Sequence, residues 1–220
     1  MLANKIRQQL GRPTQSLVGW LVKKFLTRNN RVLEENAVRL CGIQPDDTVL
    51  EVGFGPGLGL EAAASILSGP RGKLFGVDYS EFMYKVASER VKGLITSGKV
   101  TLHHSSVEAM PLPDSSVDKV FHCNCYYFWP DLTAGTAEIH RVMKPGGLMV
   151  VTLKVHTVAY VASKKLIPGE HWRPEAYMDA LRATGFTDIR MEDKNDKDIT
   201  FQAIFATASK SRMPGFPEYK

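Results

Sequence analysis

The sequence predicts an α/β protein built around a mostly parallel sheet, and three observations support this fold class. Strand-like and helix-like stretches alternate over most of the chain. A glycine-rich turn joins the first strand of that series to a helix at Val49–Glu61, and the pattern changes to two consecutive strands after Gly185. Strands separated by helices form parallel βαβ units, whereas two strands joined by a short loop form an antiparallel hairpin. We therefore expect a parallel sheet that ends in a hairpin.

The individual elements follow from hydrophobic runs and helical periodicity. The expected strands are 48–52, 72–77, 99–104, 117–124 and 147–155, and the expected helices are 32–41, 57–69, 80–97, 131–143 and 173–184. The hairpin is expected in FTDIRMEDK and ITFQAIFATA, on either side of the charged turn NDKD. We expect one compact domain over 45–210, with a helical cap or lid over 1–44 and a tail at 211–220.

Composition limits the class of protein. The chain of 220 residues is long enough to bury a core without disulfides, and no apolar run reaches the roughly 18 residues of a membrane span, so integral membrane association is not expected. Three cysteines, Cys41, Cys123 and Cys125, do not make a disulfide framework and fit a reducing, cytoplasmic location. The net charge of +5 permits an anionic partner without requiring one. We expect no nucleic-acid partner.

The N-terminal segment is basic. It carries Lys5, Arg7, Arg12, Lys23, Lys24, Arg28 and Arg31, and no acidic residue precedes Glu34. A mitochondrial transit peptide has this composition. The apolar residues Leu17, Val18, Leu21, Val22, Phe25 and Leu26 recur at helical spacing, which equally indicates an amphipathic helix lying on the domain. We favour the packed helix and keep mitochondrial targeting as the alternative.

The turn after the first strand indicates a site for a nucleotide-like cofactor. A dinucleotide fingerprint, GxGxxG, fails from Gly53 and from Gly55, because Leu58 and Leu60 stand at the sixth position. The pattern is instead ExGxGxGxG from Glu51 to Gly59. An acid at this strand end suits a positively charged part of a ligand, and Pro56 removes a backbone N–H that a phosphate would need. The glycines alone are also compatible with a tight turn that binds nothing.

A second acid supports a cofactor site. Asp78 ends the strand in GKLFGVDYS, where a carboxylate can accept both hydroxyls of a ribose. The same position allows Asp78 or Ser80 to cap the following helix.

Four stretches together resemble a known family. Glu51–Gly59, GVDYSEFM, SSVEAMPLPDSSVDKV and RVMKPGGLMVVT are similar, in order and spacing, to the motifs of class I methyltransferases that depend on S-adenosylmethionine (SAM). The similarity is strongest to the methyltransferase type 11 group, which includes the ubiquinone and menaquinone C-methyltransferases. NCYYFWPD and the leading GRPTQSLVGWLVKKFLTRNN resemble a small subgroup of it. The resemblance implies a Rossmann-like sheet of seven strands in the order 3-2-1-4-5-7-6, with strand 7 antiparallel.

The resemblance also implies a SAM site. Backbone at Gly53, Gly55 and Gly57 would surround the methionyl part of SAM, together with Glu51, and Asp78 would bind the ribose. The residues implied near the adenine are Tyr79, Met83, Ser106, Val107 and Glu108. Much of the superfamily has an aspartate where Ser106 stands, and a serine hydroxyl can replace part of that contact. The stretch Met143–Gly147 is a structural turn in the family.

The acceptor of the methyl group is expected over the carboxyl ends of the fourth and fifth strands. Candidates there are Asn124, Tyr126, Tyr127, Trp129 and His156, with Asn124 also beside the cofactor. Asn124 either orients the acceptor or binds loop backbone. Tyr127 flanks the acceptor, and His156 is a candidate general base or a structural residue. The aromatic cluster is either core or pocket wall.

Two other motifs are given no catalytic role. His103 and His104 are expected on opposite faces of one strand. Cys123 and Cys125 share a face, but two ligands do not complete a metal site, so no metal is expected.

Three functions remain open from the sequence. The first is a SAM-dependent methyltransferase acting on a small molecule, because the segment 157–172 and the N-terminal helix can cap the site and leave little room for a macromolecule. The second is a nicotinamide-dependent oxidoreductase, disfavoured by the missing GxGxxG and by Glu51. The third is a non-catalytic partner protein that keeps the fold. The nature of the acceptor, including the atom that is methylated, does not follow from the fold.

Overall fold

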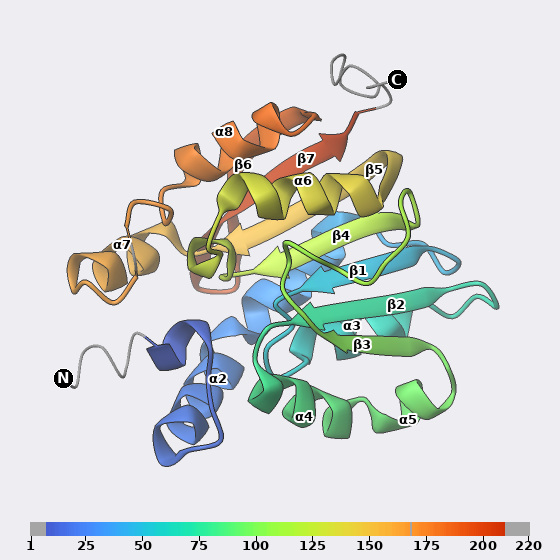
Figure 1. Cartoon of the computed structure of the whole chain (residues 1–220), viewed down its shortest axis with the longest axis horizontal. Coiled ribbons are helices and arrows are strands. Elements are labelled where there is room, and N and C mark those ends of the chain that lie inside the picture. Colours follow the sequence, from blue (N-terminus) through green and yellow to red (C-terminus); the bar gives the residue numbers. More distant parts are fainter. Residues whose placement is uncertain (1–7, 168, 210–220) are drawn as a thin grey trace, which may run out of the picture.

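The computed structural model describes residues 8–167 and 169–209. Its centre is a seven-stranded sheet in the order β3-β2-β1-β4-β5-β7-β6 (Figure 1). The strands are β1 (Thr48–Val52), β2 (Lys73–Asp78), β3 (Val100–His104), β4 (Val117–Cys123), β5 (Met143–Leu153), β6 (Phe186–Asp196) and β7 (Ile199–Ala208). The first five pair in parallel, and β7 pairs antiparallel with both β5 and β6. The predicted order and the antiparallel seventh strand are confirmed.

Helices cover both faces of the sheet. In Figure 1, α6 and α8 lie in front of the sheet, whereas α3 and the C-terminal part of α2 lie behind it. One hydrophobic core includes Ile139 and Leu181, and the second includes Leu33 and Leu60. The helices are α2 (Leu17–Cys41), α3 (Leu58–Ile66), α4 (Glu81–Arg90), α5 (Lys92–Thr96), α6 (Leu132–Val142), α7 (Val155–Ser163) and α8 (Pro174–Ala183).

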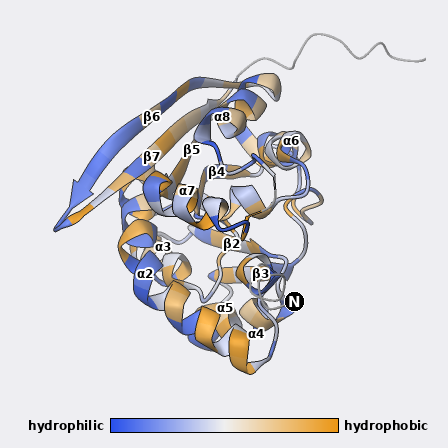
Figure 2. Ribbon diagram, turned by 90° about the vertical axis from the view of Figure 1, so that its left-hand side faces the viewer, coloured by the Kyte–Doolittle hydropathy of each residue, from blue (hydrophilic) through white to orange (hydrophobic). Residues whose placement is uncertain are grey.

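The hairpin forms the outer edge of the sheet. β6 is largely exposed along its length, whereas most of β7 is buried between its neighbours. Figure 2 shows this difference as a mostly hydrophilic β6 beside a more hydrophobic β7. The register shifts between Thr187 and Arg190, where Asp188 adopts a left-handed φ of 52°. A bulge of this kind bends an edge strand and limits its pairing with other chains.

The N-terminal helix differs from the prediction. An amphipathic helix near 15–27 and a second helix at 32–41 were expected, but α2 is one helix of 25 residues. The polar stretch between them contains neither proline nor glycine, so nothing interrupts the helix. Side chains of Thr27 and Asn29 donate to the carbonyls of Lys23 and Phe25, four residues earlier, and stay within the helical geometry.

The two halves of α2 have different environments. The second half packs against α3, β4 and β5 and belongs to the core. The first half is largely exposed on its outer side. Of the expected cap over 1–44, the structure describes the part from residue 8 onward. The expected tail at 211–220 lies outside the described residues. Within the described part of the chain, no helix has the length and apolar character needed to span a bilayer.

Three other boundaries differ from the expected ones. The helix expected at 80–97 is divided at Val91 into α4 and α5, and Gly93 lowers helix propensity there. α6 ends at Val142 and β5 follows without a loop, since the Met143–Gly147 turn lies within β5, where the register against β4 shifts. The strand expected to reach residue 155 ends at Leu153, and α7 begins at Val155, two residues before the expected capping segment 157–172.

The parallel strands all point the same way, and their carboxyl ends meet on the left side of Figure 1. The first half of α2 and all of α7 lie on that same side. In open α/β sheets this edge is where ligands bind.

A close approach below the glycine turn generates a stability prediction. A Cβ added at Gly59 in α3 would lie 2.8 Å from both Cδ of Glu51 and Cε2 of Phe121. Gly59→Ala is expected to destabilise the protein by about 1 to 3 kcal/mol through overpacking. Gly93→Ala in α5, where an added Cβ meets nothing within 4 Å, is the matched control and is expected to stabilise by about 0.4 to 1 kcal/mol. Urea unfolding measures both, and equal midpoints would contradict the packing argument.

Candidate active site

A cavity of about 980 Å³ lies at the carboxyl ends of the parallel strands. Its walls come from the loops after β1, β2, β3 and β4, from α2 and from α7. Small-molecule sites usually measure about 300 to 1,000 Å³, so this cavity has room for more than one small molecule.

The glycine turn is held in a left-handed path. Gly53, Gly55 and Gly57 have φ values of 67°, 49° and 83°. The Gly53 N–H donates to the carbonyl of Val77 at 2.7 Å, which joins the turn to β2. A Cβ at Gly53 would lie 2.9 Å from Cβ of Cys125, so this position has no room for a side chain. Gly53 and Gly55 line the cavity, whereas Gly57 is buried at the start of α3.

Asp78 lies against this turn. Its Oδ2 accepts from the Gly55 N–H at 2.8 Å, and its Oδ1 accepts from the Ser80 N–H at 2.7 Å. Burial raises the pKa of Asp78 to about 6, although both backbone donors lower it. Ser80 is the residue that caps α4, because its Oγ accepts from the Met83 N–H. Asp78 is therefore not the helix cap. It lines the cavity, and its carboxylate can accept further hydrogen bonds beyond these two.

The residues expected near the adenine are brought together along one wall. The cavity is lined there by Tyr79, Met83, Ser106, Val107 and Glu108. Tyr79 is 54% exposed, whereas Met83 is buried. The Ser106 Oγ accepts from the Glu108 N–H at 3.3 Å, and the Glu108 carboxylate accepts from the Asp131 N–H at 2.9 Å. The loop after β3 is thus held against the start of α6.

A segment before α2 crosses this wall. The guanidinium of Arg12 lies 4.2 Å from the centroid of the Tyr79 ring, and the Ser80 hydroxyl donates to the Pro13 carbonyl at 2.5 Å. On the other side, a Cβ at Gly11 would lie 2.8 Å from the ring of Phe128. Residues 11–13 therefore bridge the start of α4 and the loop after β4. We refer to this segment as the strap.

Glu51 does not line the cavity, but Glu34 of α2 does. The Glu51 carboxyl packs against Gly59, and its two oxygens and Oε2 of Glu34 are buried without a hydrogen-bond partner among the described residues. Burial raises the pKa of Glu34 to about 8. Burial and the neighbouring Glu34 raise the pKa of Glu51 well above its usual range. The pair therefore retains a proton at neutral pH, beside a cavity.

Asn124 lies at the junction between the cofactor wall and the rest of the cavity. It has a φ of 49°, a conformation that asparagine tolerates better than most residues. Its Nδ2 donates to Oδ1 of Asn30 in α2 at 3.2 Å, so the partner is a side chain and not loop backbone. Its Oδ1 is buried and has no partner among the described residues. This oxygen is available to a hydrogen-bond donor on a ligand.

The aromatic cluster after β4 is divided between core and cavity. Tyr127, Phe128 and Trp129 line the cavity. Tyr126 instead stacks on Tyr177 of α8, with ring centroids 4.3 Å apart, and is fully buried in the core. Beside it, His122 is buried, which lowers its pKa to about 3, and its Nε2 lies 2.8 Å from the Tyr177 hydroxyl.

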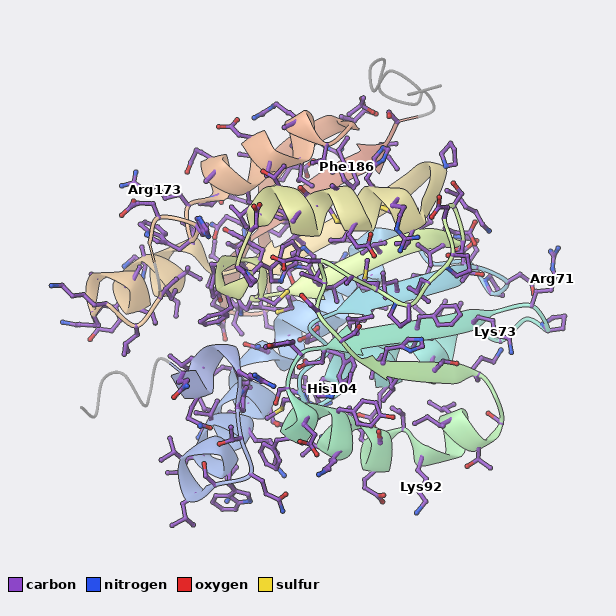
Figure 3. The ribbon with its side chains drawn as sticks, in the orientation of Figure 1. Arg71, Lys73, Lys92, His104, Arg173 and Phe186 are labelled. Carbon is purple, nitrogen blue, oxygen red and sulfur yellow. The ribbon has the colours of Figure 1, made fainter. Side chains whose placement is uncertain are left out.

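The remaining histidines lie away from the cavity. His156 is exposed on α7 and is not among the described residues that line the cavity. His103 is half-buried on β3, and the exposed His104 at the end of that strand, labelled in Figure 3, lies with its Nε2 3.1 Å from the Tyr79 carbonyl.

The cysteine pair lines the cavity, and burial raises the pKa of both the Cys123 and the Cys125 thiols. Across residues 8–167 and 169–209, no group of three or more potential ligands is placed to hold a metal ion.

Several residues of the site were not identified from the sequence. Glu34 was noted only as the first acidic residue after the basic segment, and Asn30 and the strap had no motif. Lys154, Val158 and Val161 line the wall formed by α7. The sequence feature that could have pointed to the α2 residues is the helical spacing of the apolar residues before Glu34. This spacing indicates that one side of α2 is buried, but it does not identify what that side faces.

Comparisons with known proteins agree with this geometry. A family model described as a methyltransferase domain matches residues 50–151. An uncharacterized methyltransferase, YdaC of Bacillus subtilis, is 34% identical over 186 residues, which cover 84% of this chain and 96% of that protein. The ubiquinone/menaquinone biosynthesis C-methyltransferase UbiE of Geobacter sulfurreducens is 32% identical over 123 residues, covering 56% of this chain and 47% of its own.

A solved structure has the same fold. A SAM-dependent methyltransferase from Aquifex aeolicus superimposes with a TM-score of 0.64 at 21% identity, covering 84% of this chain and 96% of that chain. The fold, the order of the motifs and the full-length similarity to YdaC agree, and they set aside the nicotinamide-dependent alternative. The chain belongs to the type 11 group of SAM-dependent methyltransferases.

Proposed function

We propose that the chain transfers the methyl group of SAM to a small, apolar or planar acceptor by in-line displacement. The observation that carries the proposal is the division of one cavity into two parts. The glycine turn and Asp78 form a polar part, whereas the first half of α2, the aromatic residues after β4 and α7 form an apolar part. An apolar chamber beside a polar cofactor wall favours a small apolar acceptor over a macromolecule.

The residues of the polar part fit SAM. The cofactor supplies a methyl group on a positively charged sulfur. We infer that Asp78 binds the ribose hydroxyls, that the backbone of Gly53 and Gly55 borders the methionyl group, and that Tyr79 and Met83 contact the adenine, with Ser106, Val107 and Glu108 along the same wall. The buried, unpartnered oxygens of Glu34 and Glu51 suit a cation. We infer that Glu34 meets the positively charged end directly and Glu51 supports it from behind.

The apolar part would orient the acceptor and exclude water. The leaving group is already charged and requires little chemical activation. The main contributions left to the protein are to align the acceptor with the methyl group and to exclude water from the site. The strap is held on both sides of the opening by the Tyr79–Ser80 region and by Phe128. We infer that the strap, α2 and α7 act as a lid.

Asn124 is the best placed residue to contact the acceptor. Asn124 lines the cavity and its buried Oδ1 has no partner among the described residues, and Tyr127 and Trp129 line the same cavity, where they could flank the acceptor. His156 is less well placed, because it is exposed outside the lining. With three free cysteines, we also keep a reducing, cytoplasmic location as a proposal.

The ribose contact gives a binding prediction. Asp78→Ala is expected to weaken SAM binding by about 1.5 to 3 kcal/mol, the range for hydrogen bonds to a charged group. Isothermal titration calorimetry with SAM and S-adenosylhomocysteine measures the change, and circular dichroism checks that the variant is folded. A folded variant with unchanged affinity would exclude Asp78 from the ribose site.

The acid pair gives a pH prediction for the ligand-free protein. The pKa of Glu34 is about 8 in the folded protein, against an ordinary value of 4.5, so the folded chain retains a proton that the unfolded chain releases. The free energy of unfolding is expected to fall as pH rises from about 5 to 8. Glu34→Gln removes this group. The free energy of unfolding of this variant is expected to fall less steeply with pH and to exceed that of the wild type near pH 8.

Glu35→Gln, one residue along and exposed, is the matched control and should keep the wild-type profile. Thermal unfolding at several pH values, with and without SAM, provides the measurement. The increase in Tm caused by SAM should grow with pH in the wild type and grow less in Glu34→Gln, where only Glu51 and Asp78 remain to ionise, because a cation binds better to ionised carboxyl groups. The same profile in both variants would show that Glu34 is not the titrating group.

The acceptor is found by incubating the protein with methyl-labelled SAM and extracts of small metabolites and lipids, followed by mass spectrometry of labelled products. Asn124→Ala is then expected to lower methyl transfer tenfold or more, about 1.4 kcal/mol in the barrier, while SAM affinity stays nearly unchanged. Asn124→Gly separates the side chain from the left-handed backbone, since glycine accepts that φ without strain.

Both Asn124 variants should lose activity if the side chain orients the acceptor. Activity retained by Asn124→Gly would assign a backbone role instead. His156→Ala tests the general-base hypothesis in the same assay. Bound SAM with no labelled product from any extract would favour the non-catalytic alternative.

A further inference from the structure

The outer side of the first half of α2 is unusually apolar for a surface. The exposed fractions are 85% for Leu17, 44% for Trp20, 59% for Leu21 and 55% for Phe25. These residues recur every three or four positions, so they form one stripe along the helix. In Figure 2, the ribbon of α2 alternates between hydrophobic and hydrophilic segments. Single exposed apolar residues are ordinary, whereas a contiguous stripe indicates an interaction surface.

Basic side chains accompany this stripe. Lys23, Lys24 and Arg28 lie within the same turns, and none of the three forms an ion pair within the described residues. The Lys24 ammonium lies 3.9 Å from the centroid of the Trp20 ring. No acidic residue precedes Glu34 in the sequence, so the surface has no compensating negative charge of its own. We call this stripe and its basic side chains the α2 face.

The α2 face is continuous with the opening of the cavity. Leu21 and Phe25 are exposed and also line the cavity. On α7, whose Val158 and Val161 line the cavity, Tyr160 is 61% exposed, and the Lys164 ammonium lies 5.1 Å from the centroid of its ring. Both α2 and the end of α7 therefore carry an exposed aromatic ring with a lysine. Figure 1 shows α2 and α7 on the same side of the molecule.

These features favour an anionic bilayer over other partners. Apolar and aromatic side chains flanked by lysine and arginine are typical of helices that lie in the membrane interface. A nucleic acid would use the basic residues but leave the leucines exposed. A symmetric pairing of two copies would place one basic surface against another. We propose that the α2 face docks the protein on the surface of an anionic membrane.

Docking on a membrane does not depend on which acceptor is methylated. A second part of the proposal rests on the proposed function: an apolar acceptor reaches the cavity from the lipid side, between α2 and α7. In this arrangement the exposed parts of Leu21 and Phe25 form the path from bilayer to cavity. The strands and the cofactor wall remain on the water side.

Flotation with vesicles tests the proposal on the full chain. Vesicles of equal parts phosphatidylcholine and phosphatidylglycerol should bind the protein, vesicles of pure phosphatidylcholine should bind it much less, and high salt should release it. Leu17→Ser is expected to lower the partition coefficient roughly tenfold. Lys24→Gln with Arg28→Gln is expected to lower it roughly 30-fold. None of these residues lines the cavity.

Matched controls lie elsewhere on the surface. Met191→Ser changes an apolar residue of β6 that is 39% exposed, and Arg71→Gln with Lys92→Gln removes two charges from parts of the molecule away from α2 (Figure 3). The controls should bind vesicles as the wild type does. Equal losses in controls and α2 variants, equal binding to both vesicles, or no binding to either would overturn the proposal.

Light scattering on the same samples measures the oligomeric state and so tests whether a second copy of the chain covers the α2 face. A wild-type dimer that Leu17→Ser converts to a monomer would assign the α2 face to self-association and overturn membrane docking. SAM binding by each variant shows that the fold is intact. If the wild-type protein binds vesicles but transfers no methyl group, the proposed function would be contradicted and the docking proposal would stand.

Discussion

The left-handed turn after β1 is the constraint on which the rest of the site depends. The chain leaves β1, reverses within Gly53–Gly57 and enters α3, and the turn is fixed by the Gly53 bond to β2 and by the Asp78 bond to Gly55. Larger side chains at Gly53 or Gly59 would collide with Cys125 or with Glu51. The turn therefore fixes the distance between β1, β2 and β4, and with it the shape of the cofactor wall.

One cavity combines two kinds of environment. At the glycine turn, burial raises the pKa of Glu34, Glu51 and Asp78, because the charged form of each carboxyl group is costly to bury. A positively charged ligand relieves this cost, which couples recognition to charge as well as to shape. The apolar part offers no such selectivity and accepts whatever shape fits. This division suits an enzyme whose cofactor is constant and whose acceptor is chosen by fit.

The sequence was informative where function depends on local order. The glycine turn, Asp78 and the hairpin follow from neighbouring residues, and all were found in the expected places. The places of Glu34, Asn30 and the strap in the site result from contacts between distant parts of the chain. One example is the hydrogen bond between Asn30 and Asn124, which are 94 positions apart. No pattern within α2 reveals such a contact. The expectation of a separate helix at 32–41 was wrong, because a change in polarity does not end a helix without glycine, proline or a cap.

Because α2 is a single helix, the buried Glu34 and the exposed Leu17 belong to one stiff rod, about 25 Å apart along its axis. A tilt at one end is therefore a tilt at the other. Any surface that holds Leu17 also sets the angle at which Glu34 and Asn30 meet the cavity. Under the two proposals, the cofactor at Glu34 and the membrane at Leu17 would act on the same helix, and any coupling between them would be equal in both directions.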